Sequence, residues 1–211
     1  MIRKTRRERD RGRMRRLVLD AARQLFVREG FDNVSMRRIA GAIGYSPAAI
    51  YRYFRNKREI LSTLRAEGFD RYVAGQRARA AQWPDLLTRV REEVVAYLRF
   101  AMEEPEYYHL MFCADCDEVE LEGALAASSQ ESHALVQEIM DQAVAAGVFG
   151  EVDAQVVTLS LWAGVHGLAQ LIRSGRVALL AEGADLESLV DGVMDFMLRP
   201  GWCRCGGGEA E

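Results

Sequence analysis

Apolar side chains recur along the whole chain at the spacing of helices, three or four positions apart, and no segment shows the alternation of a strand. This pattern predicts an all-α protein. Helices are expected at residues 13–29, 36–43, 47–54, 57–80, 84–103, 106–112, 125–146, 153–174 and 186–198. The stretches 113–123 and 176–185 are expected to be connections.

Two of the early helices and the tight turn between them form a compact pattern. Ser35 and Ser46 stand where N-caps are needed, because each hydroxyl can accept an otherwise unpaired backbone N–H. Gly44 ends the first helix where the backbone needs a positive φ. Ile50 and Phe54 lie four apart and are expected to face inward. The open face keeps small residues, aromatic hydroxyls and cations, which suits a helix that enters a DNA major groove.

These features predict a helix-turn-helix motif at residues 35–54 that contacts DNA. The candidate DNA-binding residues are Ser35, Arg37, Ser46, Pro47, Ala48, Ala49, Tyr51, Arg52, Tyr53 and Lys57. Tyr51 and Arg52 are expected to meet the groove, and Tyr53 and Lys57 the sugar-phosphate backbone. The alternative interpretation is an ordinary helical hairpin with a solvated face.

The motif resembles the DNA-binding signature of the TetR/AcrR family of bacterial transcription regulators. The residues that carry the resemblance are Ala40-x-x-Ile43-Gly44-Tyr45-Ser46 and Ile50-Tyr51-x-Tyr53-Phe54-x-x-Lys57-x-Glu59-x-Leu61. The match reaches back to Ala21, Leu25, Phe26 and Gly30-Phe31, so it covers about the first third of the chain. A later stretch, LWAGVHG at residues 161–167, resembles the WHG-type C-terminal domain of a subset of that family.

The net charge of −3 conceals two parts of opposite sign. Residues 1–58 hold 17 Lys and Arg against 5 Asp and Glu, and the remaining residues hold 11 against 26. The basic residues 1–58, which we call the head, precede an acidic remainder, which we call the body. This division suggests that only the head binds a polyanion. Residues 1–12 have almost no apolar side chains and are predicted to be a disordered basic arm. Such an arm would either contact DNA, as the resemblance allows, or serve as a solubilising tail.

The expected organisation is an N-terminal helix-turn-helix domain followed by a C-terminal helical domain. The first domain covers residues 13–58 and extends to about 72, the second covers 73–199, and 200–211 form a flexible tail. The helix at 57–80 touches both domains and is the natural lever between them. The apolar run at 159–172 is short for a membrane span, and no secretory signal is present, so the protein is expected to be cytoplasmic without a membrane partner.

The resemblance implies a homodimer in which the last two long helices pair with their copies. The candidate interface residues are Gly164, Gly167, Leu168, Leu171, Leu189, Val193 and Phe196. It also implies a small-molecule effector, and mostly apolar walls with few polar groups suit such a site. The candidate effector-binding residues are Tyr97, Phe112, Met140, Trp162 and His166. Core packing within one chain is the alternative interpretation of both sets.

The predicted function is that of a DNA-binding transcription regulator, a ligand-responsive homodimeric repressor on a palindromic operator in double-stranded DNA. A small hydrophobic or amphipathic effector would release it. A metal- or thiol-responsive regulator is the alternative, because His109, Cys113 and Cys116 share a helical spacing and Cys203-x-Cys205 could add a second pair. An enzyme with an accessory DNA-binding head is less favoured, since no catalytic constellation stands out. No catalytic residue, metal site or cofactor is predicted.

Overall fold

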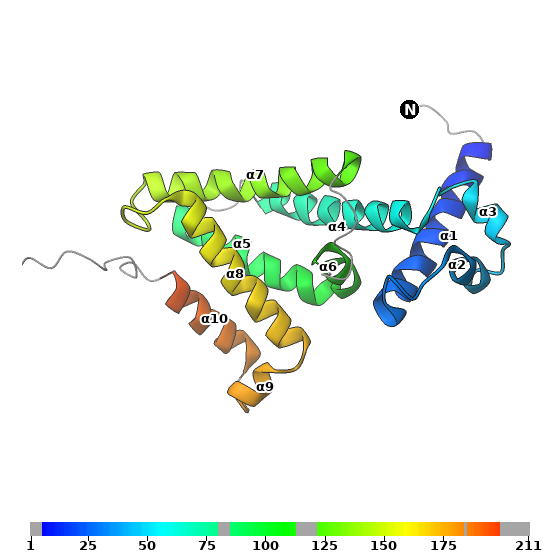
Figure 1. Cartoon of the computed structure of the whole chain (residues 1–211). Coiled ribbons are helices and arrows are strands. Elements are labelled where there is room, and N and C mark those ends of the chain that lie inside the picture. Colours follow the sequence, from blue (N-terminus) through cyan, green and yellow to red (C-terminus); the bar gives the residue numbers. More distant parts are fainter. Residues whose placement is uncertain (1–5, 80–84, 113–121, 184, 199–211) are drawn as a thin grey trace, which may run out of the picture. The chain divides into compact units, whose positions relative to one another are not determined.

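The computed structural model describes residues 6–79, 85–112, 122–183 and 185–198. Within these ranges every regular element is a helix, labelled α1 to α10 in chain order (Figure 1). The expected all-α fold class is therefore confirmed. The chain divides into two compact units, the first made of residues 1–73 and 104–130 and the second of residues 74–103 and 131–211.

The first unit is built around a three-helix head. It contains α1 (Arg6–Glu29), α2 (Met36–Ala42), α3 (Pro47–Tyr51), most of α4 (Lys57–Arg79), α6 (Pro105–Phe112) and the start of α7 (Gly123–Ala145). Both predicted N-caps are confirmed: Ser35 Oγ accepts from the N–H of Arg38 at 3.1 Å, and Ser46 Oγ accepts from that of Ala49 at 3.3 Å. Gly44 has the expected positive φ of 73°. The most deeply buried apolar side chains of the head include Val18, Phe26, Ile39, Ile50, Phe54, Ile60 and Leu64.

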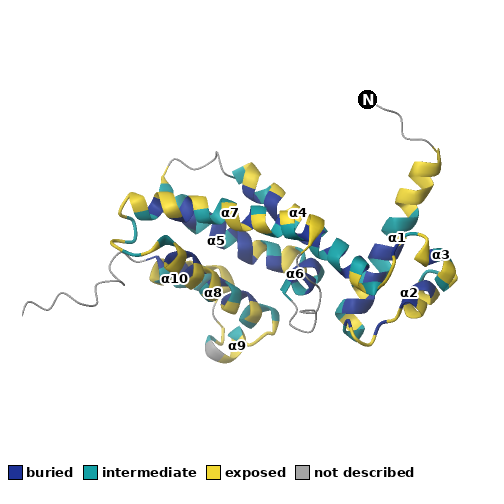
Figure 2. Cartoon of the chain, turned by 45° about the horizontal axis from the view of Figure 1, so that its top comes forward, coloured by how far each residue is buried: buried dark blue, intermediate teal, exposed yellow. Residues whose placement is uncertain are grey.

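Helix α1 begins at Arg6, seven residues before the predicted start. Residues 6–13 are exposed on all sides, as the free end of α1 in Figure 2 shows. The prediction of a disordered arm is therefore wrong for residues 6–12, whereas residues 1–5 lie outside the described part of the chain. Low apolar content argued for disorder, but arginine is a good helix former, and the packed part of α1 supplies a nucleus from which the helix can propagate. Glu8 in the first turn also complements the helix dipole.

Helix α6 belongs to the first unit, although the sequence pattern placed it in the C-terminal domain. Its Tyr107 is 1% exposed, and the ring lies between the guanidinium groups of Arg23 and Arg71, which are 4.8 and 4.5 Å from the ring centroid. The Tyr107 hydroxyl donates to Glu67 at 3.1 Å, and the same carboxylate pairs with Arg16 at 2.8 Å. These contacts hold the short helix against α1 and α4.

The second unit is a bundle of longer helices. It contains α5 (Leu86–Glu103), most of α7, α8 (Ala154–Arg173), the single-turn α9 (Val177–Leu180) and α10 (Leu186–Met197). Asp153 caps α8 as predicted, because its Oδ1 accepts from the N–H groups of Gln155 and Val156 at 2.7 and 3.3 Å. The core cluster consists of Val90, Ile139, Met140, Ala143, Val157, Leu161 and Leu198. Helix α9 lies in a stretch that the sequence pattern assigned to a loop.

Some expectations fall on parts of the chain that the structure does not describe. They concern the possible thiol or metal ligands and the flexible tail. The residues are Cys113, Cys116, Cys203, Cys205 and the stretch 200–211.

Candidate nucleic-acid interface

One side of helix α3 packs against the rest of the head, and the opposite side is exposed to solvent. Ile50 and Phe54 are at most 1% exposed and fix the helix to the head. On the opposite side Ala48, Tyr51 and Arg52 are exposed, with Tyr51 54% accessible. A small side chain allows close approach to base edges, while a phenol and a guanidinium can donate hydrogen bonds to bases or phosphates. Such a face has the shape and chemistry of a recognition helix.

The two neighbouring arginines of α2 are in different environments. Arg38 pairs with Glu29 through two contacts, Nη2 to Oε1 at 2.6 Å and Nε to Oε2 at 3.2 Å. The hydrogen bond from Arg38 lowers the pKa of the Glu29 carboxyl. Arg37 is exposed and makes no ion pair with any residue in the described ranges. Arg37, the predicted contact, is therefore the cation of α2 that remains available to a phosphate.

Lys57 at the start of α4 is already bonded within the head. Its ammonium donates to the carbonyl oxygens of Phe31 at 2.8 Å and Asp32 at 3.4 Å, and lies 4.2 Å from the centroid of the Phe31 ring. The ammonium also forms an ion pair with Asp32, whose Oδ1 lies 4.0 Å away, and its third donor can turn to a phosphate oxygen. Lys57 thus has a structural task that the sequence pattern did not reveal, beside its predicted contact with the DNA backbone.

Two further residues of the head were not selected from the sequence. Arg15 Nη1 donates to the carbonyl oxygen of Tyr53 at 2.7 Å, and its guanidinium lies 4.2 Å from the centroid of the Phe54 ring. Arg15 therefore ties α1 to the end of α3. Tyr45, in the turn between α2 and α3, is 48% exposed. Its position inside the signature was the available signal, whereas the sequence grouped Arg15 only with the basic arm and not with α3.

The structure brings together three of the predicted effector-binding residues in the second unit. The Tyr97 hydroxyl and His166 Nδ1 are 2.8 Å apart, and the ring of Trp162 lies 5.9 Å from that of His166. Burial lowers the pKa of His166, so the imidazole is neutral near pH 7. Trp162 is 47% exposed, which sets it at the surface of the unit rather than in its interior.

The other two predicted effector-binding residues lie elsewhere. Met140 is 2% exposed and belongs to the core cluster of the second unit. Phe112 belongs to the first unit, where its ring lies 5.1 Å from that of Tyr108 and 6.1 Å from that of Phe69. The position of the Phe112 ring is therefore explained by aromatic packing within the first unit.

The predicted interface residues separate into two groups. Gly164 faces α10 of the same chain, because a Cβ at this position would collide with the methyl group of Met197. Leu168 is buried in the second unit. A Cβ at Gly167, in contrast, would meet open space, and Phe196 is 51% exposed. Intermediate burial is found for Leu171, Leu189 and Val193.

Two exposed apolar residues of α8 extend the outward face and were missed. Val156 is 55% exposed and Leu159 is 61% exposed. They precede Gly167 by eleven and eight positions, so all three lie on one side of the helix. A partner helix packed on this side would cover these apolar side chains and would explain why they are exposed in a single copy of the chain.

The described residues bear on metal binding and on membrane insertion in different ways. Among them, no group of three or more His, Cys, Asp or Glu side chains could hold a metal ion. One helix in the described ranges, α8, is long and apolar enough to cross a bilayer by length and composition. Its buried face, with Val157 and Leu161, packs into the core cluster of the second unit.

A capped helix-turn-helix with an open recognition helix, joined to a helical bundle, defines a DNA-binding regulator. Residues 18–64 match the family described as bacterial regulatory proteins, tetR family, and residues 90–197 match the tetracyclin repressor-like C-terminal domain. The second match alone covers about half of the chain, and the protein belongs to the TetR family of transcription regulators. Neither description names the WHG subtype, which stays a prediction.

Curated relatives agree with this assignment. The chain is 40% identical over 60 residues to the HTH-type transcriptional repressor Rv1474c of Mycobacterium tuberculosis, a match covering 28% of this chain and 32% of that protein. It is 30% identical over 95 residues to the HTH-type transcriptional activator FasR of Mycolicibacterium smegmatis, covering 45% and 43%. These two matches thus span less than half of each relative. The HTH-type transcriptional repressor AcnR of Corynebacterium glutamicum is 25% identical over 186 residues, covering 87% and 89%.

A solved structure supports the fold over nearly the whole chain. It is described as a protein with unknown function from Rhodococcus sp. RHA1 and is 28% identical to this chain. The TM-score is 0.69, and the superposition covers 88% of this chain and 93% of that one.

Proposed function

We propose that the protein is a homodimeric repressor that binds a palindromic operator in double-stranded DNA and leaves it when a small hydrophobic or amphipathic effector binds. The observation that carries the proposal is the open face of α3, where Ala48, Tyr51 and Arg52 are exposed while Ile50 and Phe54 anchor the helix. A face of this kind is prepared to enter the major groove.

The residues of the head divide into base contacts and backbone contacts. Tyr51 and Arg52 project from α3 and would read base edges. Arg37, the remaining donor of Lys57 and the Tyr53 hydroxyl would meet phosphates, which fix orientation but carry no sequence information. Ser35 and Ser46 act first as caps, so their hydroxyls contribute to DNA binding mainly by ordering α2 and α3.

Dimerisation is supported by the outward faces of α8 and α10. Val156, Leu159 and Phe196 each expose about half or more of their surface, although large apolar side chains are usually buried. A second copy of the same helices would cover them and would place two heads about 34 Å apart, one turn of DNA. A two-fold protein of this kind reads a palindrome.

Effector response would pass through α4, because this helix supplies residues to both units. In the first unit Glu67 pairs with Arg16 at 2.8 Å, and in the second unit Arg79 pairs with Glu93 at 3.1 Å. A ligand beside Tyr97 and Trp162 acts only if it favours one placement of α4 over another. A coupling of about 1–3 kcal/mol would change operator affinity roughly 5–150-fold.

Repression in the cytoplasm is the form of regulation that the family and two of the three named relatives favour. The relatives Rv1474c and AcnR are named repressors, and FasR is named an activator. A DNA-bound dimer represses by occupying its operator, which requires no further surface on the protein.

The test is selection of bound sequences from random DNA duplexes with the purified protein. An inverted repeat should emerge, and Arg52→Gln should change the selected bases. Arg99→Gln is the matched control, since Arg99 is also exposed but lies on α5 in the second unit. Sedimentation should give a dimer, and a screen of small apolar compounds by melting temperature should find ligands of the native state. Failure to enrich any duplex would overturn the proposal.

A further inference from the structure

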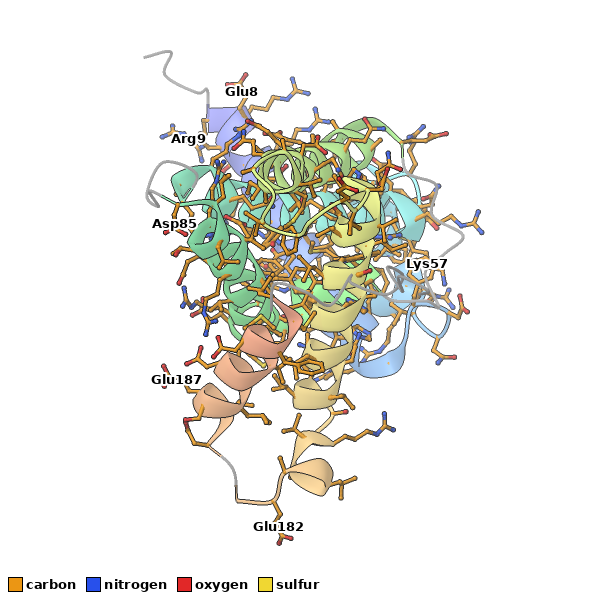
Figure 3. The ribbon with its side chains drawn as sticks, turned by 90° about the vertical axis from the view of Figure 1, so that its left-hand side faces the viewer. Glu8, Arg9, Lys57, Asp85, Glu182 and Glu187 are labelled. Atoms are coloured by element: carbon orange, nitrogen blue, oxygen red, sulfur yellow. The ribbon has the colours of Figure 1, made fainter. Side chains whose placement is uncertain are left out.

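Helix α10 has few apolar contacts with its own protomer, although it supplies part of the candidate dimer face. Among the residues described for α10, Met194 alone is buried, and the buried Leu198 follows directly after the helix. Residues 186–190, all of them described, contain no buried side chain. Figure 3 shows Glu187 projecting from this end of α10, away from the neighbouring helices. Packing inside the protomer therefore involves mainly the second half of α10.

One arginine of α5 joins the middle of α10 to the rest of the second unit. Arg91 Nη2 donates to Asp191 Oδ1 at 2.9 Å, and Arg91 Nη1 donates to Asp195 Oδ1 at 2.5 Å. The two aspartates lie one helical turn apart, so a single planar guanidinium bonds both of them through separate nitrogens. Within the described ranges these are the only ion pairs that α10 makes. We call Arg91, Asp191 and Asp195 the Arg91 clamp.

The Arg91 clamp and the candidate dimer face lie on different sides of α10. At about 100° per residue, Asp195 lies roughly 100° from Phe196 around the helix, and Asp191 lies roughly 140° from it in the same direction. Phe196 is 51% exposed, whereas 29% of the Arg91 side chain is exposed. The clamp therefore holds α10 without occupying the surface that a second copy of the chain would cover.

We propose that Arg91 is a positioning residue for dimerisation: through the Arg91 clamp it holds α10 in the orientation that pairs with a second copy of the chain. The inference rests on the homodimer of the proposed function. A helix that is only partly packed loses conformational freedom when a partner orders it, and this loss of entropy opposes association. A contact that orders the helix in the free protomer removes part of that cost.

The expected size of the effect follows from the exposure of the clamp. The side chains of Asp191 and Asp195 are 58% and 68% exposed, so solvent screens both ion pairs. Exposed ion pairs change an equilibrium constant by about two- to fivefold, and a dimer contains two copies of the clamp. Arg91→Gln should therefore raise the dissociation constant of the dimer by about 4- to 25-fold.

Arg99 provides a matched control on the same helix. It is exposed, carries the same charge and makes no ion pair with any residue in the described ranges. Arg91→Gln and Arg99→Gln each make the acidic body more negative by one charge, so a general increase in repulsion between protomers would affect both variants equally. The clamp predicts that Arg99→Gln changes the dissociation constant much less than Arg91→Gln. Equal effects of the two variants would overturn the inference.

Removal of the two aspartates tests the clamp with the opposite change of charge. Asp191→Asn combined with Asp195→Asn makes the body less negative, so an effect of net charge alone would strengthen the dimer. The clamp predicts a weaker dimer instead, and adding Arg91→Gln to the aspartate variant should weaken it little further. Glu187→Gln is the control on α10, because Glu187 is exposed and makes no ion pair in the described part of the chain. A stronger dimer in the aspartate variant would assign the effect to net charge and contradict the positioning role.

The experiment measures the dissociation constant by sedimentation of a dilution series of the protein without DNA, at two salt concentrations. Between about 0.1 M and about 1 M NaCl the screening length falls from about 10 Å to about 3 Å. The ratio of the dissociation constants of Arg91→Gln and the unmodified protein should therefore fall towards one at the higher concentration. Repulsion between acidic bodies and apolar packing respond to salt in both proteins and cancel in this ratio. If the dimer does not dissociate on dilution, the rate of subunit exchange replaces the dissociation constant.

The outcomes separate this inference from the proposed function. Circular dichroism checks that each variant keeps its helices, and the aspartate variant tests the clamp independently if Arg91→Gln does not fold. A ratio of one at the lower salt concentration, or a ratio that stays high at the higher one, would overturn the role of Arg91. If the unmodified protein is a monomer at every concentration, the proposed homodimer itself fails.

Discussion

The ammonium nitrogen of Lys57 lies 2.8 Å from the carbonyl oxygen of Phe31 and 4.2 Å from the centroid of its ring. The first residue of α4 is thereby joined to the connection that follows α1. Lys57, which would contact DNA, thus also holds two helices of the head together. The effects of a substitution at Lys57 on stability and on DNA binding must therefore be measured separately.

Lys57→Met should lower the free energy of unfolding by about 1–2 kcal/mol, because charge-assisted hydrogen bonds to carbonyl oxygens are lost. It should also weaken binding to all duplexes alike. Arg37→Gln is the comparison, since Arg37 is exposed and has no ion pair within the described ranges. Arg37→Gln should weaken binding without changing urea denaturation. A change of sequence preference in Lys57→Met would contradict the backbone contact assigned to it.

Gly68 of α4 makes room for α6. A Cβ at Gly68 would stand 2.7 Å from the sulfur of Met111, a side chain only 3% exposed. Gly68→Ala should therefore destabilise the protein by about 1–3 kcal/mol, although alanine is the better helix former. In the presence of Met111→Ala, the loss of unfolding free energy caused by Gly68→Ala should be smaller, because the two side chains occupy the same space. Strict additivity in urea denaturation would show that the contact does not limit the packing.

The sequence was sufficient where short-range signals decide the structure. Ser35, Gly44 and Ser46 act on neighbouring backbone, so the helix-turn-helix and its caps were predictable. The unit to which α6 belongs was not, because it depends on contacts between Tyr107 and Arg23, 84 positions earlier in the chain. The helical form of residues 6–12 was missed for another reason: low apolar content was given more weight than the helix propensity of arginine.

Gly164 and Gly167 of α8, at the candidate dimer face, also show what the sequence could not predict. Both are small, and the pattern could not tell which one approaches a helix of the same chain. The structure separates them, since Gly164 faces Met197 and Gly167 faces open space.

Gly167→Glu should therefore break the dimer and leave the protomer folded. The added carboxylate would lie on the outward face, beside exposed apolar side chains such as Leu159. Gly164→Ala should instead keep both the dimer and the melting temperature close to those of the unmodified protein, because only the flexible end of the Met197 side chain has to shift and alanine is the better helix former. Sedimentation and thermal unfolding of both variants distinguish the two effects. A dimeric Gly167→Glu protein would move the interface away from α8.

The final prediction concerns pH and the pair formed by His166 and Tyr97. Burial lowers the pKa of His166, whereas the imidazole of the unfolded chain titrates near 6.5. As the pH falls through that value, the unfolded chain takes up a proton before the folded one does, so the folded state loses stability. His166→Gln should therefore show a smaller loss of unfolding free energy between pH 7.5 and pH 5.5 than the unmodified protein. His109 and His133 are present in both proteins and cancel in the comparison. Tyr97→Phe separates the hydrogen bond from the titration: it should cost about 0.5–1.5 kcal/mol at pH 7.5, when the 2.8 Å contact with His166 is lost. Identical pH dependence in the His166→Gln and unmodified proteins would mean that the imidazole keeps its ordinary pKa in the fold.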